Sequence, residues 1–471
     1  MAEHHPLFKD LSGIVGESNV IDDPVLLAAY SQDASLLPPH YPELVVRPGS
    51  VEEVVEVVKL ANRTKTPVIP TGGRASMCGA SLPLKGGITL DLTRLNRVVN
   101  VDEANLKATV ECGITWGALL YELAKVGYEP CFKGPYSGHA ATVGGSISSN
   151  TIGLGSAKWG QAGDTVVSLE VVLPTGEVLR TGTAANPRAP PYLRYVVGPD
   201  LTGIFCGDHG IFGVKTKATI KIQPLPKAIG YSSFGFSDLV SAVKAFWEIQ
   251  RTQLAEDMVI LCDRKSIEQI LPEAPQVFEG VEALFVFIVQ APDEGVCSAI
   301  KSYLDSLAIN CGGRDLGEMF PKTFWESKYE MITPLFEWGM WTATCHALPT
   351  LKIPEATREA ITLFKEYRVD ELGMNYIATA MACGSNAVSY VAHTYFDPSD
   401  PEKRKIAEEI WTRRKRRVFE YGACPYWTGV GWYKEAVEYM SHEWHEALKK
   451  LKRALDPNNV MNPGAFEIWE V

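Results

Sequence analysis

Residues 69–92 read IPTGGRASMCGASLPLKGGITLDL. An apolar run leads directly into Gly72-Gly73, and small side chains then dominate as far as Ser81. Because glycine permits close approach to the main chain and sharp turns, three explanations are open: a phosphate-bearing cofactor, a tight structural turn, or packing against another backbone. The spacing matches neither G-x-G-x-x-G nor G-x-x-x-x-G-K-[ST]. The residues alone therefore support a phosphate site and a structural turn equally.

The residues upstream of this loop predict a β-α-β unit. Leu44 to Val46 form an apolar run, and Ser50 with Glu53 has the spacing of a helix-capping box. Apolar residues at helical spacing follow between positions 51 and 61, and residues 66–70 return as a strand. Downstream, short β-branched segments, one amphipathic helix and a hairpin with a Pro-Thr-Gly turn complete a mixed α/β domain over residues 40–225.

A second segment, GPYSGHAATVGGSISSNTIGLGSAKWG at 134–160, carries seven glycines and many hydroxyl groups. A stretch so poor in bulky side chains needs a reason to stay ordered. One such reason is an extended polar ligand lying between the two glycine-rich segments, with hydroxyls and main-chain amides taking the place of water. The pair of segments thus favours a ligand more than either segment does alone.

Composition limits the classes of function. The chain has 471 residues, enough for more than one domain, with 46% hydrophobic and 21% charged residues. A net charge of −11 disfavours a general nucleic-acid binder, and we interpret RRKRR at 413–417 as a solvated helix face. Ten cysteines without a C-x-x-C pair argue against a zinc ribbon or a cysteine-ligated iron–sulfur cluster.

The N-terminal residues MAEHHPLFKD lack the apolar core of a secretory signal, and no apolar run is long enough to span a bilayer. We therefore expect reduced thiols in a cytoplasmic protein without a membrane span. The organisation predicted along the chain is an N-terminal helical segment (1–39), the first domain (40–225), a second α+β domain (226–445) and a C-terminal segment (446–471). No internal repeat is visible in the sequence.

Several ordered motifs resemble landmarks of one flavoprotein superfamily. They are RPGSVEEVVEVVKLAN, the P-x-G-G loop, ATVGGSISSNTIG, WGQAGDTVVSLEVVLPTGEVLRTG, GPDLTGIFCGDHGIFGVKT and ALDPNNVMNPGAF. The chain resembles the vanillyl-alcohol oxidase/p-cresol methylhydroxylase (PCMH-type) superfamily, most of all its D-lactate dehydrogenase and glycolate oxidase FAD-subunit branch. The resemblance implies an α+β fold: a two-subdomain FAD-binding domain, a substrate (cap) domain with an antiparallel sheet, and a C-terminal segment returning to the FAD domain.

The resemblance also implies which residues hold FAD. The pyrophosphate would lie on the main chain after the first strand, and the flavin and ribityl chain along the second glycine-rich segment. The residues implied are Thr71, Gly72, Gly73, Arg74, Ala75, Ser76, Gly79, Ala80, Ser137, Thr142, Gly144, Gly145, Ser148, Asn150, Gly213, Val214 and Asn462.

Departures from the family pattern predict non-covalent FAD and no metal. Arg74 stands where some relatives carry a histidine that attaches FAD, and Gly138-His139 occupy the other attachment point, where a cysteine would be needed. Arg74 would add positive charge beside the pyrophosphate or face solvent. The branch's metal-binding segments are reduced here to one histidine, His393, and one histidine is poor coordination for a divalent ion.

The second domain supplies the residues predicted to handle substrate. The family arginine that grips a carboxylate is replaced by Lys328, which keeps the charge but loses the bidentate fork. Many aromatic residues in this region suit a flatter, more apolar substrate. Strand alternation places His393 and Tyr395 on one face and Tyr390 on the other. The predicted catalytic residues are His393, Tyr395, Tyr390, Lys328 and His346.

The resemblance predicts an FAD-dependent oxidoreductase that removes a hydride from the CH–OH group of an alcohol or 2-hydroxy acid. The alternatives are an oxidase or dehydrogenase of a phenolic or other aromatic substrate, a catalytically decayed FAD-binding subunit, and a redox-neutral flavoenzyme. Since the chain holds no cluster ligands, electrons would pass to a partner protein, a quinone or oxygen. We also expect a homodimer.

Overall fold

The computed structural model describes residues 4–196, 198–272, 276–331, 333–426 and 429–466. The chain divides into two compact units. Unit 1 comprises residues 1–151, 162–223 and 427–471, and unit 2 comprises residues 152–161 and 224–426. The division at 223/224 lies close to the predicted boundary at 225/226, whereas residues 152–161 belong to unit 2 and residues 427–445 to unit 1.

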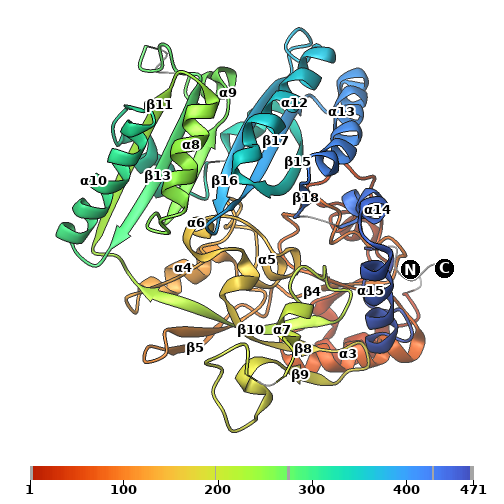
Figure 1. Ribbon diagram of the computed structural model, residues 1–471. Coiled ribbons are helices and arrows are strands. Elements are labelled where there is room, and N and C mark those ends of the chain that lie inside the picture. Colours follow the sequence, from red (N-terminus) through yellow and green to blue (C-terminus); the bar gives the residue numbers. More distant parts are fainter. Residues whose placement is uncertain (1–3, 197, 273–275, 332, 427–428, 467–471) are drawn as a thin grey trace. The chain divides into compact units, whose positions relative to one another are not determined.

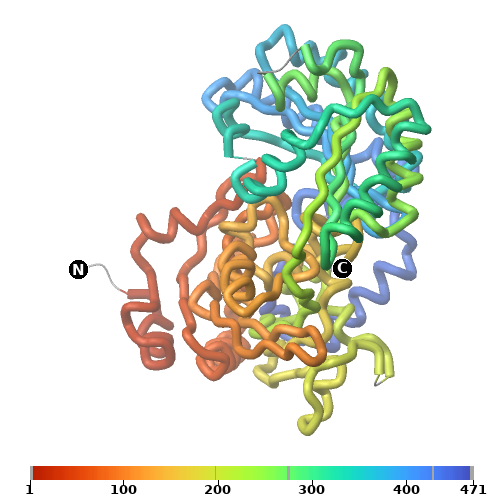
Figure 2. Tube along the Cα trace, turned by 90° about the vertical axis from the view of Figure 1, so that its left-hand side faces the viewer, coloured from red at the N-terminus to blue at the C-terminus, as the bar shows by residue number. Residues whose placement is uncertain are grey.

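The predicted β-α-β unit is β2-α3-β3 of unit 1. Its two strands belong to a four-stranded sheet in the order β1-β2-β4-β3. The Ser50 hydroxyl accepts a hydrogen bond from the Glu53 N–H at 3.2 Å and so caps α3. β4 lies parallel to both β2 and β3, which leaves the glycine-rich loop as the connection between β3 and β4. The elements are α1 (Phe8–Val15), β1 (Val20–Ile21), α2 (Pro24–Ala28), β2 (Leu44–Val46), α3 (Val51–Thr64), β3 (Val68–Thr71) and β4 (Ile88–Asp91). The N-terminal residues, red in Figure 2, lie along one edge of this unit.

A second, antiparallel sheet of unit 1 has the order β5-β6-β10-β8-β9, with β7 also paired to β10. The predicted hairpin is confirmed as β8 and β9, whose turn places Gly176 at a φ of 95°. The elements are β5 (Val98–Asp102), β6 (Lys107–Glu111), α4 (Trp116–Ala124), β7 (Tyr128–Pro130), α5 (Val143–Ser149), β8 (Val166–Val172), β9 (Val178–Arg180), α7 (Leu201–Ile204), β10 (Val214–Pro224), α14 (Gly429–Tyr439) and α15 (His442–Leu455).

Unit 2 is built on an eight-stranded antiparallel sheet in the order β14-β11-β13-β12-β16-β17-β15-β18. Helices α10, α8, α12 and α13 pack side by side against it (Figure 1). The elements are α6 (Ser156–Trp159), β11 (Ala228–Phe236), α8 (Leu239–Gln250), β12 (Asp257–Leu261), α9 (Arg264–Ile270), β13 (Ala283–Ala291), α10 (Glu294–Asn310), β14 (Arg314–Asp315), α11 (Met319–Glu326), β15 (Met340–Pro349), α12 (Ile353–Glu366), β16 (Asn375–Cys383), β17 (Ala387–Phe396), α13 (Pro401–Glu420) and β18 (Cys424–Pro425). Antiparallel sheets and packed helices confirm the predicted α+β class.

The topology of unit 2 contains a repeat that the sequence does not display. The first half runs β11-α8-β12-α9-β13-α10-β14 and the second runs β15-α12-β16-β17-α13-β18. When the strands of each half are numbered along the chain, both halves have the spatial order 4-1-3-2. Two β-α-β-β-α-β arrangements therefore meet along β12 and β16.

The basic run at 413–417 is not the solvated face that we expected. It lies on α13, where Arg414 is buried and 1% exposed, and Lys415 is also buried. Arg414 contacts Glu359 of α12 at 3.5 Å. The helix thus turns part of its charge inward, toward a partner that local sequence does not reveal. Within the described residues, no helix combines the length and apolar composition that a bilayer span requires.

Candidate cofactor site

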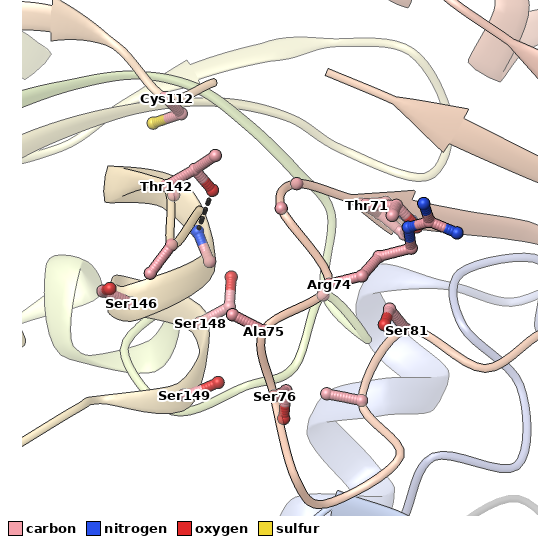
Figure 3. A pocket seen from close by; sticks show the side chains of 18 of the residues that line it. Thr71, Arg74, Ala75, Ser76, Ser81, Cys112, Thr142, Ser146, Ser148 and Ser149 are labelled. Carbon is pink, nitrogen blue, oxygen red and sulfur yellow. Dashed lines mark hydrogen bonds between the residues drawn. The ribbon is translucent and has the colours of Figure 1, made fainter. Parts of the chain in front are cut away.

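A pocket in unit 1 lies where the two glycine-rich segments approach each other. It encloses about 960 Å³ of space free of atoms, part of which is open to solvent. In Figure 3 the loop around Ala75 and Ser76 faces the Ser148 and Ser149 side chains of α5. The predicted residues that line it are Thr71, Gly72, Gly73, Arg74, Ala75, Ser76, Ala80, Ser137, Thr142, Gly144, Gly145, Ser148 and Gly213.

The Gly72-Gly73 pair is explained by backbone packing. A Cβ atom on Gly73 would lie 1.7 Å from the carbonyl oxygen of Ala140, and one on Gly72 would lie 2.2 Å from the Thr142 hydroxyl. Both distances are far inside van der Waals contact. The pair therefore lets the second glycine-rich segment come close, which supports packing against another backbone among the three explanations that the sequence left open.

The loop that follows the pair offers main-chain donors. Among the described residues, none accepts a hydrogen bond from the main-chain N–H groups of residues 72–76. These residues are half-buried and line the pocket. Unpaired, partly buried N–H groups are costly unless a ligand or water accepts from them, and consecutive amides form an anion-binding concavity. The loop therefore has the donor set that a diphosphate needs.

The start of α5, by contrast, is already satisfied. The Thr142 hydroxyl caps the helix by accepting from the Gly145 N–H at 3.2 Å (Figure 3). The N–H groups of Val143 and Gly144 donate to the carbonyls of Ile114 and Cys112, at 2.9 and 2.8 Å. This helix therefore contributes the hydroxyls of its later residues rather than free amides.

Lys215 and His209, which we did not select from the sequence, also line the pocket. Lys215 is buried and its Nζ lies 2.5 Å from Oδ1 of Asp208, which is also buried. Burial raises the pKa of Asp208, against the opposing effect of Lys215. His209 lines the pocket, and burial, followed by the Lys215 charge, lowers its pKa to about 3. Asp208 and His209 belong to the segment CGDHG of the sequence, but the sequence does not show that they are buried.

His209 is therefore a neutral imidazole at the pocket wall. Its Nε2 accepts a hydrogen bond from the Gly429 N–H at 3.4 Å, and its buried Nδ1 has no partner among the described residues. An orphaned buried ring nitrogen next to a pocket fits a site that a polar ligand completes.

Four predicted residues frame the pocket instead of lining it. Asn462 donates from Nδ2 to the carbonyls of Ala80 (3.0 Å) and His209 (2.7 Å) and so joins both walls. Asn150 ends α5 at a φ of 45°, and its Oδ1 accepts from the Gly163 N–H at 2.9 Å.

The other two lie in the surrounding core. Val214 is buried in β10, opposite Val172 of β8. Gly79 adopts a φ of 77°, and a Cβ atom there would lie 2.4 Å from the Leu37 side chain. These positions hold the walls of the pocket in place, and direct FAD contact by them stays a prediction.

Asn462 is placed by a buried ion pair at the C-terminal end of α15. Lys452 Nζ donates to Asp456 Oδ2 at 2.6 Å and to the carbonyls of Ile211 and Met461 at 2.9 and 2.7 Å. The Asp456 carboxylate also accepts from the Met461 N–H at 2.8 Å. This network fixes the turn that brings Asn462 to the pocket wall.

The predicted catalytic residues lie in unit 2, on β15, β17 and the turn after α11. His393 Nδ1 lies 3.3 Å from the Tyr395 hydroxyl, and the Trp341 ring stacks on His393 with centroids 4.6 Å apart. Tyr390 instead neighbours His346, with ring centroids 5.4 Å apart. The strand alternation predicted for this segment is thus confirmed.

The other two residues predicted to handle substrate have local partners. His346 Nε2 lies 2.9 Å from the Tyr421 hydroxyl. Lys328 Nζ donates to the Trp325 carbonyl at 2.9 Å. The catalytic roles of all five residues stay predictions.

The two histidines of this sheet are neutral at physiological pH. Burial, and then the Arg414 guanidinium, lowers the pKa of His393 to about 3 and that of His346 well below its usual range. Burial also raises the pKa of Tyr390 well above its ordinary value. A neutral His393 can accept a hydrogen bond from a substrate hydroxyl but is a weak base.

A search of the described residues finds no group of three or more His, Cys, Asp or Glu side chains arranged to hold a metal ion. By the family resemblance, Trp427-Thr428 stand where the branch carries a metal-binding Glu-His, and this pair lies outside the described residues. A metal-free site stays a prediction.

The state of His209 predicts how stability depends on pH. Its folded pKa lies below its value of 6.5 in an unfolded chain, so unfolding takes up a proton between pH 6.5 and about 3. The free energy of unfolding should fall as pH drops through this window, by up to about 1.4 kcal/mol per pH unit from this residue. In urea titrations across this range, the stability difference between wild type and His209→Asn should shrink as pH falls. A difference that does not change with pH would contradict this prediction.

Comparison with known proteins agrees with this geometry. A family model described as FAD binding domain matches residues 42–182, and one described as FAD linked oxidases, C-terminal domain, matches residues 225–466. The mitochondrial D-lactate dehydrogenase [cytochrome] of Arabidopsis thaliana is 27% identical, over 90% of this chain and 73% of its own length. Glycolate oxidase subunit GlcD of Bacillus subtilis (strain 168) is 24% identical, over 97% of this chain and 95% of its own.

The fold is also found among solved structures. A crystal structure of p-cresol methylhydroxylase with substrate bound superposes with a TM-score of 0.85 at 17% sequence identity. The match covers 98% of this chain and 96% of that chain. At this identity the match shows the fold alone, and it confirms the predicted PCMH-type architecture.

Proposed function

Because the chain belongs to the FAD-linked oxidases, with family matches over residues 42–182 and 225–466, we propose that it oxidises the CH–OH group of an alcohol or 2-hydroxy acid. FAD is its cofactor, and FAD-linked oxidoreduction is its class of chemistry. The relatives named as D-lactate dehydrogenase and glycolate oxidase subunit support a hydroxy-acid substrate.

The observation that carries the proposal is the row of unpaired amides at residues 72–76 beside the pocket. Main-chain N–H groups bind a diphosphate without a cationic side chain. The hydroxyls of Ser148 and Ser149 face the same space from α5. When bound, FAD supplies the two-electron acceptor, and the protein supplies binding and orientation.

Non-covalent attachment is part of the proposal. Arg74 occupies the position of the family's attaching histidine, and its guanidinium lies 4.3 Å from the centre of the Tyr30 ring. Guanidinium forms no bond to a flavin, and here it is engaged with a neighbouring segment. Arg74 therefore does not serve as an attachment point.

We assign substrate handling to the neutral His393 and its neighbour Tyr395. The imidazole can hold a substrate hydroxyl by accepting its proton in a hydrogen bond, while the Tyr395 hydroxyl, 3.3 Å from Nδ1, orients the ring. Lys328 would offer a single positive charge to a substrate carboxylate in place of an arginine fork.

An anaerobic substrate screen tests the function. Purified holoprotein is mixed with D- and L-2-hydroxy acids, simple alcohols and phenolic alcohols, and loss of the oxidised-flavin absorbance is followed. We expect bleaching by at least one hydroxy acid or alcohol. A flavin that none of these donors reduces, but that dithionite reduces normally, would contradict the proposal and favour the decayed-subunit alternative.

A second candidate is favoured by one specific feature of unit 2. The rings of Trp341, His393 and Tyr395 are stacked and nearly parallel, with interplanar angles of 7° to 15°. Trp338 meets Tyr395 edge-on, with ring centroids 5.1 Å apart. Such an aromatic stack suits a planar, apolar substrate. Bleaching by phenolic donors alone in the same screen would select this candidate.

Replacement of His393 by alanine should slow flavin reduction. We expect a loss of about a hundredfold in the reduction rate, because general acid–base and hydroxyl-orienting contacts contribute roughly this much. FAD content should stay unchanged. Stopped-flow reduction under anaerobic conditions measures the effect.

The matched control for His393→Ala is Tyr303→Phe. Tyr303 is an exposed residue of α10, so its hydroxyl should have no effect on the reduction rate. Equal rates for wild type and His393→Ala would return His393 to a structural role.

We further propose a cytoplasmic homodimer that passes electrons to a partner protein, a quinone or oxygen. Mixing the reduced protein with air separates the acceptors, since rapid reoxidation would select oxygen. Sedimentation at several concentrations tests the dimer.

A further inference from the structure

An irregular N-terminal segment, residues 29–37, contacts the first glycine-rich loop. We call this segment the strap. The strap follows α2 and has no helix or strand of its own. The Ala34 N–H donates to the carbonyl of Ser76 at 3.0 Å, and the Arg74 guanidinium donates to the carbonyl of Ala29. Leu37 packs at Gly79, where no room is left for a side chain. The strap thus contacts this loop at both its start and its end.

One residue of the strap links the loop to the sheet beneath it. The Tyr30 ring lies under the Arg74 guanidinium, 4.3 Å from ring centre to Cζ, and the Tyr30 hydroxyl donates to Asp91 Oδ2 at 2.8 Å. Asp91 is the register partner of Thr71, the last residue of β3 before the loop. It is itself buried and held by Thr93, whose N–H and hydroxyl donate to Oδ1 at 2.9 and 2.6 Å.

The loop needs such a restraint because Arg74 adopts an unfavourable backbone conformation. Its φ of 52° is in the left-handed region, which a residue with a side chain enters only at a cost. Arg74 sits in the middle of the five residues whose amides are unpaired. In Figure 3 its side chain points toward Thr71 and away from α5, so its contacts are made outside the pocket.

We propose that Tyr30, Arg74 and Asp91 form a clamp that fixes the loop of residues 72–76 in its FAD-binding conformation, so that the strap is part of the cofactor site. Tyr30 contacts both Arg74 and Asp91, Arg74 also contacts the strap, and in this proposal the three act as positioning residues through the loop amides. The proposal rests on FAD as the cofactor and is independent of the substrate.

The clamp also predicts that FAD binding orders the strap. If an ordered strap strengthens FAD binding, then FAD must order the strap by the same free energy. In the wild-type protein, FAD should therefore slow hydrogen exchange at the Ala34 amide, which donates to Ser76. This readout needs no enzyme activity and no substitution.

The test measures the dissociation constant of FAD and the melting temperature of the FAD-free protein. Tyr30→Ala and Arg74→Ala should each raise the dissociation constant about tenfold, the value of one lost cation–π contact together with one hydrogen bond. Tyr30→Phe keeps the ring under the guanidinium and loses only the bond to Asp91, so its increase should be smaller. Tyr41→Ala, at an exposed tyrosine beyond the strap, is the matched control and should change nothing.

The results of these experiments either support or contradict the clamp. Weaker FAD binding with an unchanged melting temperature of the FAD-free protein supports the clamp. An unchanged dissociation constant in Tyr30→Ala, or no exchange protection at Ala34 by FAD, overturns it. If Tyr30→Ala does not fold, the Tyr30→Phe titration and the wild-type exchange experiment still decide. A wild-type protein that binds no FAD would instead contradict the proposed cofactor.

Discussion

Replacing Gly73 with alanine should weaken FAD binding by roughly 5- to 150-fold, the equivalent of about 1–3 kcal/mol for an overpacked site. The new Cβ would lie 1.7 Å from the Ala140 carbonyl oxygen, so the loop or the facing segment must move. Either movement displaces the amides of residues 72–76 from the pocket. Titration of the FAD-free protein with FAD, followed by quenching of flavin fluorescence, measures the effect.

Gly13→Ala is the matched control for this substitution. A Cβ atom at Gly13 would have no neighbour within 4 Å among the described residues, and Gly13 lies in α1, where alanine favours the helix. Its FAD affinity should equal that of wild type. If Gly73→Ala also binds FAD normally, the close packing of the two glycine-rich segments is not what shapes the site.

Replacing Lys452 with methionine should lower the free energy of unfolding by about 3–5 kcal/mol, the usual cost of breaking a buried ion pair by removing one partner. Lys452 and Asp456 are both buried, and the substitution leaves the Asp456 carboxylate without its cation. Two carbonyls, those of Ile211 and Met461, also lose their donor. Urea unfolding of the FAD-free protein gives the number.

Two further variants make the Lys452 result specific. Lys450→Met, on an exposed position of the same helix, should change stability little. Lys452→Met combined with Asp456→Asn removes the uncompensated charge and should recover part of the loss. A Lys452→Met protein as stable as wild type would show that the ion pair does not hold the C-terminal turn.

Fold prediction succeeded where the signal is local. The capping pair Ser50 and Glu53, the helical spacing after it, and the Pro-Thr-Gly turn lie within a few residues of the structure that they specify. The same holds for the alternation that puts His393 and Tyr395 together and Tyr390 apart. In the site, thirteen of the seventeen residues predicted to contact FAD line one pocket, because two side-chain-poor segments are visible without knowing what they face.

The remaining features depend on contacts between residues distant in sequence. Nothing local distinguishes Arg414, which is buried against Glu359, from an exposed residue of the same basic run such as Arg416. His209 and Lys215 acquire their character from burial, which lowers the pKa of one and pairs the other with Asp208. The repeat in unit 2 exists only as a strand order.

Two glycine-rich segments, a β-α-β unit leading into the first, and the ordered motifs of an FAD-linked oxidase can all be recognised from the residues alone. Periodicity, capping and turn chemistry act over a few residues, and so they can be read along the chain. The folded structure is needed to show that Gly73 leaves room for the Ala140 carbonyl, and that the amides of residues 72–76 have no acceptor among the described residues. Close packing and hydrogen-bond satisfaction depend on neighbours in space. Here the neighbours are Gly73 and Ala140, which are some seventy residues apart along the chain.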